Sequence, residues 1–376
     1  MMIPIVAAEA FCIVTTAIHV ASTLIAIIRC KSPTHRLRAP AHARAVSLVR
    51  PVCGIENYVE ETLASAFALD YPRYEIVFCV ALAQDPVVPT VRRLMAAHPE
   101  VPARLLVGNE KISDNPKLNN LYKGWRAAAH DWVVLADSNV FMPPDYIQRL
   151  IAAWRPDTGL VCSPPVGCRP DGFWAELECA FLNTYQARFQ YAADTLGIGF
   201  AQGKSMLWKR SLLEQAGGIR ALATEVAEDA AATKVVRGAA LRVRLVDAPF
   251  EQPLGYRRAA EVWRRQVRWA RLRRTSFKVY FVPEIFAGGA WPLAAAAFAA
   301  AQSDLSLAGV PALAAVWYGS EAVLAWAAGW PLTVRSPLAW ALRDLLLPAV
   351  WFSGWLGSAF VWRGNQMRAV ESRGAV

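Results

Sequence analysis

Acidic residues follow strand-like segments at separate places in this chain, and a basic-aromatic run comes after them. The acids are Asp85, Asp137 and the pair Glu228-Asp229, and the later run is Arg265-Gln266-Val267-Arg268-Trp269. Carboxylates can hydrogen-bond a nucleoside, hold a divalent cation or accept a proton from a hydroxyl. Arginine can bind pyrophosphate bidentately, and tryptophan can stack on a sugar. The set therefore indicates group transfer from a nucleotide donor.

Asp137 is the candidate metal ligand, in the segment Asp137-Ser138-Asn139 that follows a buried strand-like run. A carboxylate there can hold a cation that bridges donor phosphates, and Mg²⁺ suits such a site because it needs few protein ligands. The alternative is an Asp that only closes a turn before the helix near Pro143. Asp85-Pro86 likewise allows a functional and a structural interpretation, a nucleoside contact or only the start of a helix.

Glu228 and Asp229 lie near the start of a predicted helix over residues 224–236. Acids at this position often only complement the helix dipole. One of them could instead deprotonate an acceptor hydroxyl, and only one can be ideally placed for it. In the polar run 115–121, Lys117 and Asn119 could bind the donor's phosphate or ribose, or could belong only to a capped helix start.

Residues 257–274 contain eight arginines and one glutamate. On a helix, Arg265, Arg268 and Trp269 share one face, because they are three and four residues apart. That face could contact pyrophosphate and line a sugar pocket. The alternative is a basic helix that only touches anionic lipid headgroups.

Strand-like and helical segments alternate between residues 45 and 163. The strands are predicted at 45–50, 74–82, 103–107, 132–136 and 160–163, and the helices at 59–69, 87–97, 117–129 and 146–154. The alternation predicts an α/β domain over 45–278, with a mainly parallel sheet and helices on both faces. Ligands bind beyond the carboxyl ends of such strands. Asp85 and Asp137 both follow strand ends.

The composition indicates a membrane protein, with 55% hydrophobic residues and a mean hydropathy of +0.25. Residues 10–28 are apolar over a membrane-spanning length, and basic residues follow them. We expect an uncleaved anchor over 1–30, with the rest of the chain on the cytosolic side. His19 and Glu9 favour the alternative, a buried core helix. The following basic residues are Arg29, Lys31, Arg36, Arg38 and Arg44.

A second apolar block covers residues 279–362, before a polar tail at 363–376. Candidate spans lie near 285–302, 306–330 and 338–362. One of these segments could instead be interfacial or re-entrant. The net charge of +10 fits an anionic membrane surface better than nucleic acid, because the basic residues flank apolar spans. We therefore expect no nucleic-acid partner.

Together these residues resemble the ceramide glucosyltransferase family, a branch of the inverting, membrane-embedded glycosyltransferases with the GT-A fold, similar to glycosyltransferase family 21. The resemblance covers nearly the whole chain. Its most specific motifs are Leu-Asp-Tyr-Pro-Arg-Tyr-Glu at 69–75, Asn-Pro-Lys-Leu-Asn-Asn-Leu at 115–121, Gln-Ala-Gly-Gly at 215–218, Ala-Glu-Asp at 227–229 and Arg-Gln-Val-Arg-Trp at 265–269.

The resemblance implies a role for each motif. It implies nucleoside binding by Asp85, metal and diphosphate binding by Asp137, and the catalytic base at Asp229. It also implies contacts of the 265–269 motif with the donor phosphates, and of Trp269 with the acceptor. The implied partners are UDP-glucose, Mg²⁺ or Mn²⁺ and a lipid acceptor such as ceramide.

The chain departs from the family pattern at Gln186, where animal members carry His, and at Asn139, where relatives carry Gly or Asp. The departure at Gln186 bears on the acceptor site, and bacterial relatives also glycosylate diacylglycerol or hopanoid lipids. The Ala- and Arg-rich composition favours a bacterial inner membrane. Two other classes stay open, a processive polysaccharide synthase and a non-catalytic membrane scaffold.

Overall fold

The computed structural model describes residues 2–31, 35–40, 42–303, 307–362 and 365–369. The chain forms two compact units, each assembled from separate stretches of sequence. We name the unit that contains the long apolar helices the membrane unit, and the unit that contains the large sheet the α/β unit. The membrane unit comprises Met1–Ser32, Gly167–Ala192 and Tyr256–Ser358, and the α/β unit comprises Pro33–Val166, Ala193–Gly255 and Ala359–Val376.

The α/β unit is built on a seven-stranded sheet with the order β3-β2-β1-β4-β7-β5-β8. Its first four strands in this order are parallel, while β7 runs antiparallel to both β4 and β5. The predicted mainly parallel sheet is confirmed, and β7 and β8 are strands that the pattern did not predict. The strands are β1 (Val46–Pro51), β2 (Tyr74–Val80), β3 (Ala103–Val107), β4 (Trp132–Ala136), β5 (Thr158–Cys162), β7 (Ser205–Lys209) and β8 (Arg242–Leu245).

The helices of the α/β unit follow the predicted segments closely. Asn115 caps α4, since its side chain accepts hydrogen bonds from the backbone N–H of Lys117 and Leu118. The predicted helix over 224–236 begins later, at Glu228, because a 3-10 helix precedes it. These elements are α2 (Val59–Ala64), η1 (Ser65–Phe67), α3 (Val88–Ala97), α4 (Pro116–Ala127), α5 (Tyr146–Ala152), α8 (Arg210–Gln215), η3 (Gly218–Thr224) and α9 (Glu228–Gly238).

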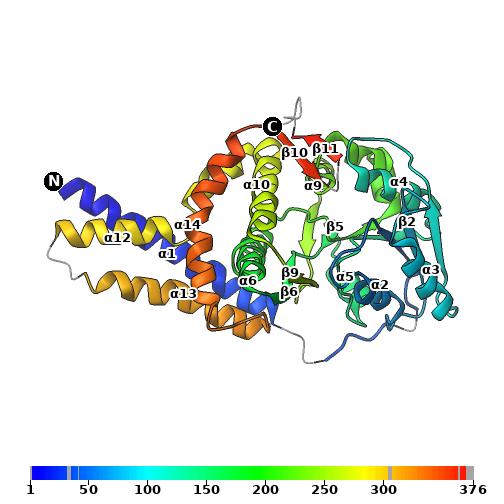
Figure 1. Cartoon of the computed structure of the whole chain (residues 1–376), viewed down its shortest axis with the longest axis horizontal. Helices are drawn as coiled ribbons and strands as arrows, with labels where there is room; N and C mark the ends of the chain where they lie inside the picture. Colours follow the sequence, from blue (N-terminus) through cyan, green and yellow to red (C-terminus); the bar gives the residue numbers. More distant parts are fainter. Residues whose placement is uncertain (1, 32–34, 41, 304–306, 363–364, 370–376) are drawn as a thin grey trace. The chain divides into compact units, whose positions relative to one another are not determined.

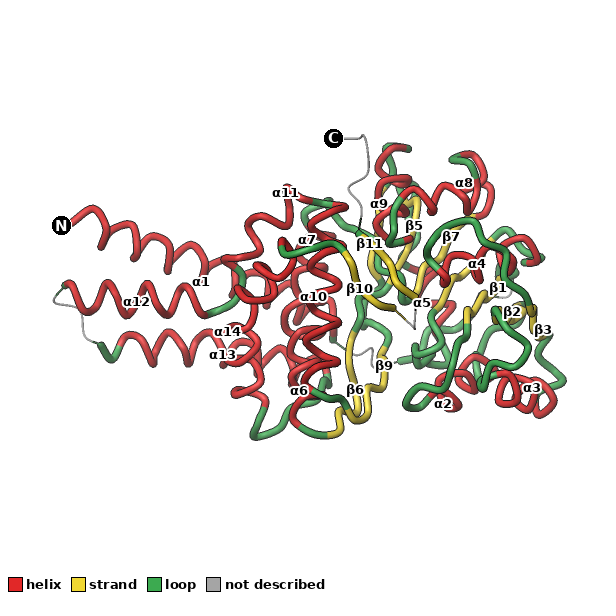
Figure 2. The backbone as a smooth tube through the Cα atoms, turned by 45° about the horizontal axis from the view of Figure 1, so that its top comes forward, coloured by secondary structure: helices red, strands yellow, loops and turns green. Residues whose placement is uncertain are grey.

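The membrane unit is helical, and its helices α1, α12 and α13 pack side by side (Figure 1, Figure 2). Its elements are α1 (Met2–Cys30), α6 (Phe173–Cys179), η2 (Ala180–Ala187), α10 (Ala259–Ser276), α11 (Lys278–Phe281), η4 (Val282–Phe286), α12 (Ala290–Gln302), α13 (Gly309–Ala328) and α14 (Ser336–Trp355). The remaining elements are β6 (Val166–Asp171), α7 (Arg188–Thr195), β9 (Glu251–Tyr256), β10 (Ala359–Trp362) and β11 (Asn365–Arg368).

Helices in the membrane unit are long and apolar enough to cross a bilayer. Within the described residues, Ile3–Cys30 and Gly309–Ala328 meet this criterion singly, and Lys278–Phe286 with Ala290–Gln302 meets it as a pair bent by 43°. Such a pair is either a broken span or a re-entrant loop. Apolar side chains on α1 point outward, as Ile3 at 84% exposure illustrates. This outward apolar surface fits contact with lipid tails.

The predicted span near 338–362 is corrected by the structure. Helix α14 ends at Trp355, and residues 359–362 form strand β10. The helix also carries Arg343 and Asp344, which are fully buried. Of the predicted tail, residues 363–364 and 370–376 lie outside the described part, and Asn365–Arg368 form β11.

Buried charged side chains in the membrane unit have charged or polar partners within it. Arg343 Nη2 lies 2.8 Å from Glu321 Oε1 on α13 and 2.8 Å from the neighbouring Asp344 Oδ1. Arg188 Nη1 donates to His19 Nδ1 at 3.0 Å, so the lone pair of this ring nitrogen faces the guanidinium. A buried charge without such a partner would be strongly destabilising. These polar residues therefore hold the helices together from the inside.

Arg50 shapes the loop that follows β4. It is fully buried at the end of β1, and its Nη2 donates to the backbone carbonyls of Asp137, Ser138 and Val140 at 3.0 to 3.2 Å. Its Nη1 donates to the Thr62 carbonyl at 2.8 Å. Burial lowers the pKa of Arg50 to about 10, so the group stays protonated at neutral pH. One cation thus determines where the Asp137 loop lies.

Arg50→Met should destabilise the α/β unit, because it leaves buried carbonyl oxygens without donors. We expect a loss of about 3 kcal/mol or more in the free energy of unfolding. This corresponds to a thermal midpoint lower by about 5 °C or more in detergent. Arg92→Met, at an exposed position on α3, is the matched control. Equal midpoints for the two variants would contradict the assigned role of Arg50.

Candidate active site

The carboxyl end of β4 and the start of β7 bring two charged residues together in the α/β unit. Ala136 pairs with Ser205 in the antiparallel register, and the Asp137 N–H donates to the Lys204 carbonyl at 3.0 Å. Because β7 runs opposite to β4, the residue before β7 lies beside the residue after β4. Asp137 and Lys204 are therefore neighbours, although they are 67 positions apart in sequence.

Lys117, near the start of α4, is the centre of this site. Its Nζ lies 2.6 Å from Asp137 Oδ1 and 2.6 Å from Glu228 Oε1, and it donates to the Gly203 carbonyl at 2.7 Å. Lys204 Nζ lies 3.0 Å from the other carboxylate oxygen of Asp137. A single ammonium thus joins the end of β4, the start of α9 and the segment before β7.

The pKa values of the paired groups follow from these contacts. Burial alone would raise the pKa of Asp137, but Lys117 and Lys204 outweigh it and lower the pKa to about 2. Burial would lower the pKa of Lys117, but Asp137 and Glu228 outweigh it and raise the pKa above its ordinary value. Asp137 and Lys117 are therefore both charged at neutral pH.

The two adjacent acids at the start of α9 have different environments. Glu228 is buried, with one oxygen on Lys117 and the other accepting from Asn115 Nδ2 at 2.7 Å. Asp229 is half-buried, and its oxygens accept from the backbone N–H of Gly203 at 3.1 Å and of Ala230 at 2.9 Å. Burial, and then the neighbouring Glu228, raise the pKa of Asp229 to about 6. Asp229 is thus the acid suited to accept a proton near neutral pH.

Asp85 and Asn119 lie in the same unit and have structural roles of their own. Asp85 Oδ1 accepts from the backbone N–H of Gly54 and Val87, each at 2.9 Å. Asn119 Oδ1 accepts from Ile112 and Ser113 N–H at 2.9 and 3.0 Å, and so holds the loop before α4. Their predicted contacts with a donor remain predictions.

The other predicted site residues lie in the membrane unit, on α10 and η2. Arg265 forms an ion pair with the buried Glu178, and its guanidinium carbon lies 5.9 Å from the centre of the Trp269 ring. Arg265 and Trp269 thus share one face of α10, which also carries Arg268. Gln186 lies on η2, an eight-residue π-helix, and its Nε2 donates to Gln266 Oε1 at 3.2 Å. Such helices are rare and occur often at functional sites.

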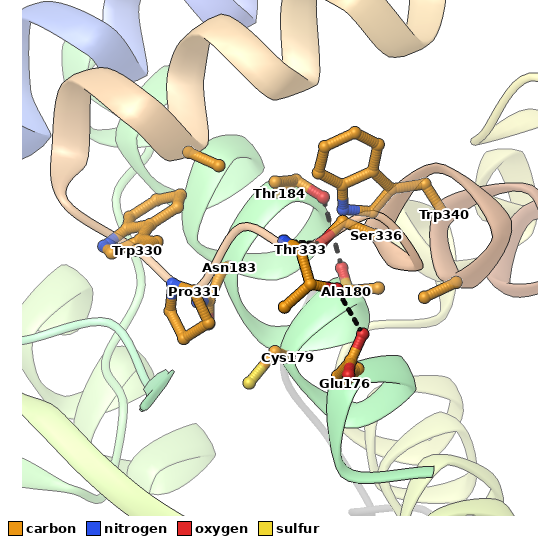
Figure 3. Close-up of a pocket in the computed structure, with 12 residues that line it drawn as sticks. Glu176, Cys179, Ala180, Asn183, Thr184, Trp330, Pro331, Thr333, Ser336 and Trp340 are labelled. Carbon is orange, nitrogen blue, oxygen red and sulfur yellow. Dashed lines mark hydrogen bonds between the residues drawn. The ribbon is translucent and has the colours of Figure 1, made fainter. Parts of the chain in front are cut away.

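A pocket in the membrane unit lies between α6, η2, the end of α13 and the start of α14 (Figure 3). Its aromatic lining comes from Trp330 and Trp340. Thr333 Oγ1 donates to Glu176 Oε2 at 2.8 Å, and Thr184 Oγ1 donates to Glu321 Oε2 at 2.7 Å. These polar lining groups are already paired within the protein, so the pocket offers mainly an apolar and aromatic surface.

The sequence matches the model of glycosyl transferase family 21 over residues 14–375. The chain belongs to this family. Relatives include ceramide glucosyltransferase 1 of Caenorhabditis elegans, 27% identical over 241 residues, which are 64% of this chain and 52% of that protein. The ceramide glucosyltransferase of Komagataella phaffii is 37% identical over 121 residues, covering 31% of this chain and 24% of that protein. The chain thus matches about half or less of these relatives' length.

A solved structure supports the fold of this family 21 member. A mannosyltransferase from Pyrobaculum calidifontis, determined in complex with GDP-Man and Mn²⁺, aligns with a TM-score of 0.51 at 21% identity. The alignment covers 90% of this chain and 99% of that one. The predicted GT-A fold is confirmed by this likeness together with the parallel sheet.

Asp137, the predicted metal ligand, has its carboxylate oxygens paired with Lys117 and Lys204 in the structure. No group of three or more His, Cys, Asp and Glu side chains gathers to hold a metal ion within the described part of the chain. Mg²⁺ and Mn²⁺ sites of nucleotide enzymes commonly use one or two carboxylates and take phosphate oxygens and water as further ligands. A cation at the single Asp137 carboxylate would need a diphosphate and water as further ligands, and the predicted metal role of Asp137 remains a prediction.

Sequence reasoning missed two residues of the site, Lys204 and Arg50. Lys204 precedes a strand that was not predicted, so nothing placed it beside Asp137. The short apolar run Met206-Leu207-Trp208 after Gly203 was the available signal for that strand. Arg50 was assigned only to a strand, and a fully buried arginine has no pattern in sequence that separates it from an exposed one.

Gly203→Ala should disrupt the charged cluster. A Cβ at this position would lie 2.7 Å from Glu228 Oε1 and 3.0 Å from Lys117 Nζ, so the ion pair must shift. Because small displacements in a catalytic site are costly, we expect a loss of about 100-fold in kcat/KM for transfer. Gly238→Ala, where a Cβ meets nothing within 4 Å, is the control. Equal kcat/KM for both variants would show that the cluster tolerates displacement.

Proposed function

We propose that this chain transfers glucose from UDP-glucose to the hydroxyl of a membrane lipid, with ceramide as the first candidate acceptor. The proposal is carried by one observation, the placement of Asp137, Lys117 and Asp229 together at the carboxyl end of β4. Ligands bind at this edge of open α/β sheets. Membership of glycosyl transferase family 21 and the apolar helices support a lipid-directed reaction.

The donor would lie across the strand ends of the α/β unit. Asp85 and Asn119 would contact the nucleoside, and Lys117 the diphosphate. Asp137 would hold Mg²⁺ or Mn²⁺, which supplies positive charge to the diphosphate when bound. The charged state of Lys117 at neutral pH supports its role towards phosphate oxygens.

Asp229 would act as the general base. The lipid hydroxyl oxygen bonds to the anomeric carbon of glucose, and the bond from this carbon to the diphosphate oxygen breaks. The hydroxyl proton passes to the Asp229 carboxylate, and the leaving group departs as UDP. Attack opposite the leaving group inverts the anomeric centre and gives a β-glycoside. The raised pKa of Asp229, about 6, supports proton transfer near neutral pH.

The acceptor would reach the reaction from the bilayer. We place Gln186 and Trp269 at the acceptor, and Arg265 and Arg268 at the donor phosphates. Diacylglycerol and hopanoid lipids are alternative acceptors for the same mechanism. The basic residues after α1 support an orientation with the α/β unit on the cytosolic face, and we place the protein in a bacterial inner membrane.

Other functions receive less support. A processive polysaccharide synthase extrudes its chain through a pore and needs more spans, whereas at most three candidate spans are found among the described residues. A non-catalytic membrane scaffold would not require an acid of raised pKa beside an ion-paired carboxylate. Absence of transfer from every UDP-sugar offered would support the scaffold instead.

The test is a transfer assay with radiolabelled UDP-glucose and Mg²⁺ in detergent, in which ceramide and diacylglycerol are offered separately. Label in the ceramide product alone supports the proposal as stated. Label in the diacylglycerol product keeps the mechanism and changes the acceptor. With no label in either product, other UDP-sugars and hopanoids are tried, and failure of all of them overturns the proposal.

Asp229→Asn should leave UDP binding intact and lower the rate of transfer by about 100-fold or more. For the wild type, kcat/KM should fall as the pH drops below about 6, because protonated Asp229 cannot accept the hydroxyl proton. The pH profile of kcat/KM measures this decrease at low pH directly. Asp247→Asn, at an exposed position, serves as the control. Full turnover in Asp229→Asn would overturn the base assignment.

A further inference from the structure

Lys204 brings a second cation into the site. Its Nζ lies 3.0 Å from Asp137 Oδ2 and donates to Asn139 Oδ1 at 3.0 Å. The Lys204 side chain is 20% exposed, compared with 11% for Lys117. The ammonium of Lys204 is therefore the more accessible of the two to a ligand that arrives from solvent.

The charges of the site explain why a second ammonium is needed there. The carboxylates Asp137, Glu228 and Asp229 are matched in number by the cations Lys117, Lys204 and the buried Arg50. Without Lys204 the cluster would carry an excess negative charge. A diphosphate brought to this edge of the sheet would then meet stronger repulsion, since like charges oppose binding at short range.

We propose that Lys204 is a donor-binding residue whose ammonium contacts the diphosphate of the nucleotide sugar. This inference rests on the proposed use of a nucleotide-sugar donor. A divalent cation at Asp137 would compete with Lys204 for the same carboxylate, and phosphate oxygens are the natural alternative acceptors for a flexible lysine. Lys204 thus supplies positive charge in addition to that of the metal.

A purely structural role for Lys204 gives different consequences. In that case the lysine only holds Asp137 and Asn139 in place, and its loss would weaken every ligand of the site equally. A diphosphate contact instead affects ligands that carry phosphate and spares those that do not. UDP and uridine therefore distinguish the two roles.

The experiment measures UDP and uridine affinities of the full-length chain in detergent by calorimetry, once with Mg²⁺ and once with EDTA. Lys204→Met should weaken UDP binding about tenfold or more, because a charge-assisted hydrogen bond is lost, and should leave uridine binding unchanged. The loss should be greater with Mg²⁺ than in EDTA, because without a divalent cation Lys204 keeps the Asp137 carboxylate as its partner. Lys204→Arg should keep UDP affinity close to the wild type. Lys209→Met, at the other end of β7, is the matched control and should bind both ligands normally.

Each outcome supports or overturns the inference. Equal UDP affinity for Lys204→Met and the wild type overturns it, while the proposed function stands. An equal loss of UDP and uridine binding, or a lower thermal midpoint, shows a structural role and also overturns it. A wild type that binds no UDP under either condition contradicts the proposed donor itself, and so separates failure of the function from failure of the Lys204 assignment.

Discussion

The ammonium of Lys117 between two carboxylates is the interaction on which the site depends. Asp137 and Glu228 come from distant parts of the sequence, and both approach Lys117 Nζ within 2.6 Å. Two carboxylates in a partly buried place repel each other and lose solvation, so they can share it as anions only with a cation between them. The neighbouring backbone has to allow this contact, and Gly203 does so because it has no side chain to fill the space.

The same cation separates the roles of two adjacent acids. Glu228 faces Lys117 and Asn115, so its charge serves the structure of the site. Asp229 has backbone donors instead, and burial together with the charge of Glu228 raises its pKa to about 6. Neighbouring residues on one helix thus become an ion-pair partner and a candidate base. The difference arises from the partners that the fold brings to each side chain.

Buried charges also have partners in the membrane unit, where they connect helices. Glu321, Arg343 and Asp344 are fully buried and satisfy one another, while apolar side chains such as Ile3 face outward. Hydropathy found the long helices but extended the final span too far. Residues 356–362 are also mostly apolar, so composition alone does not separate strand β10 from the end of α14 at Trp355.

The sequence alone determined the alternating elements, the long apolar helix α1 and the positions of Asp137 and Asp229 relative to the elements of the α/β unit. These features are local, since buried strands such as β2 and β4 are apolar runs and the cap at Asn115 acts within one turn. Only the tertiary structure decided which side chains meet. Lys204 reaches Asp137 because β7 pairs antiparallel with β4, and this register depends on partners remote in sequence. Backbone pairing and burial, which no local pattern encodes, turned separate charged residues into one site.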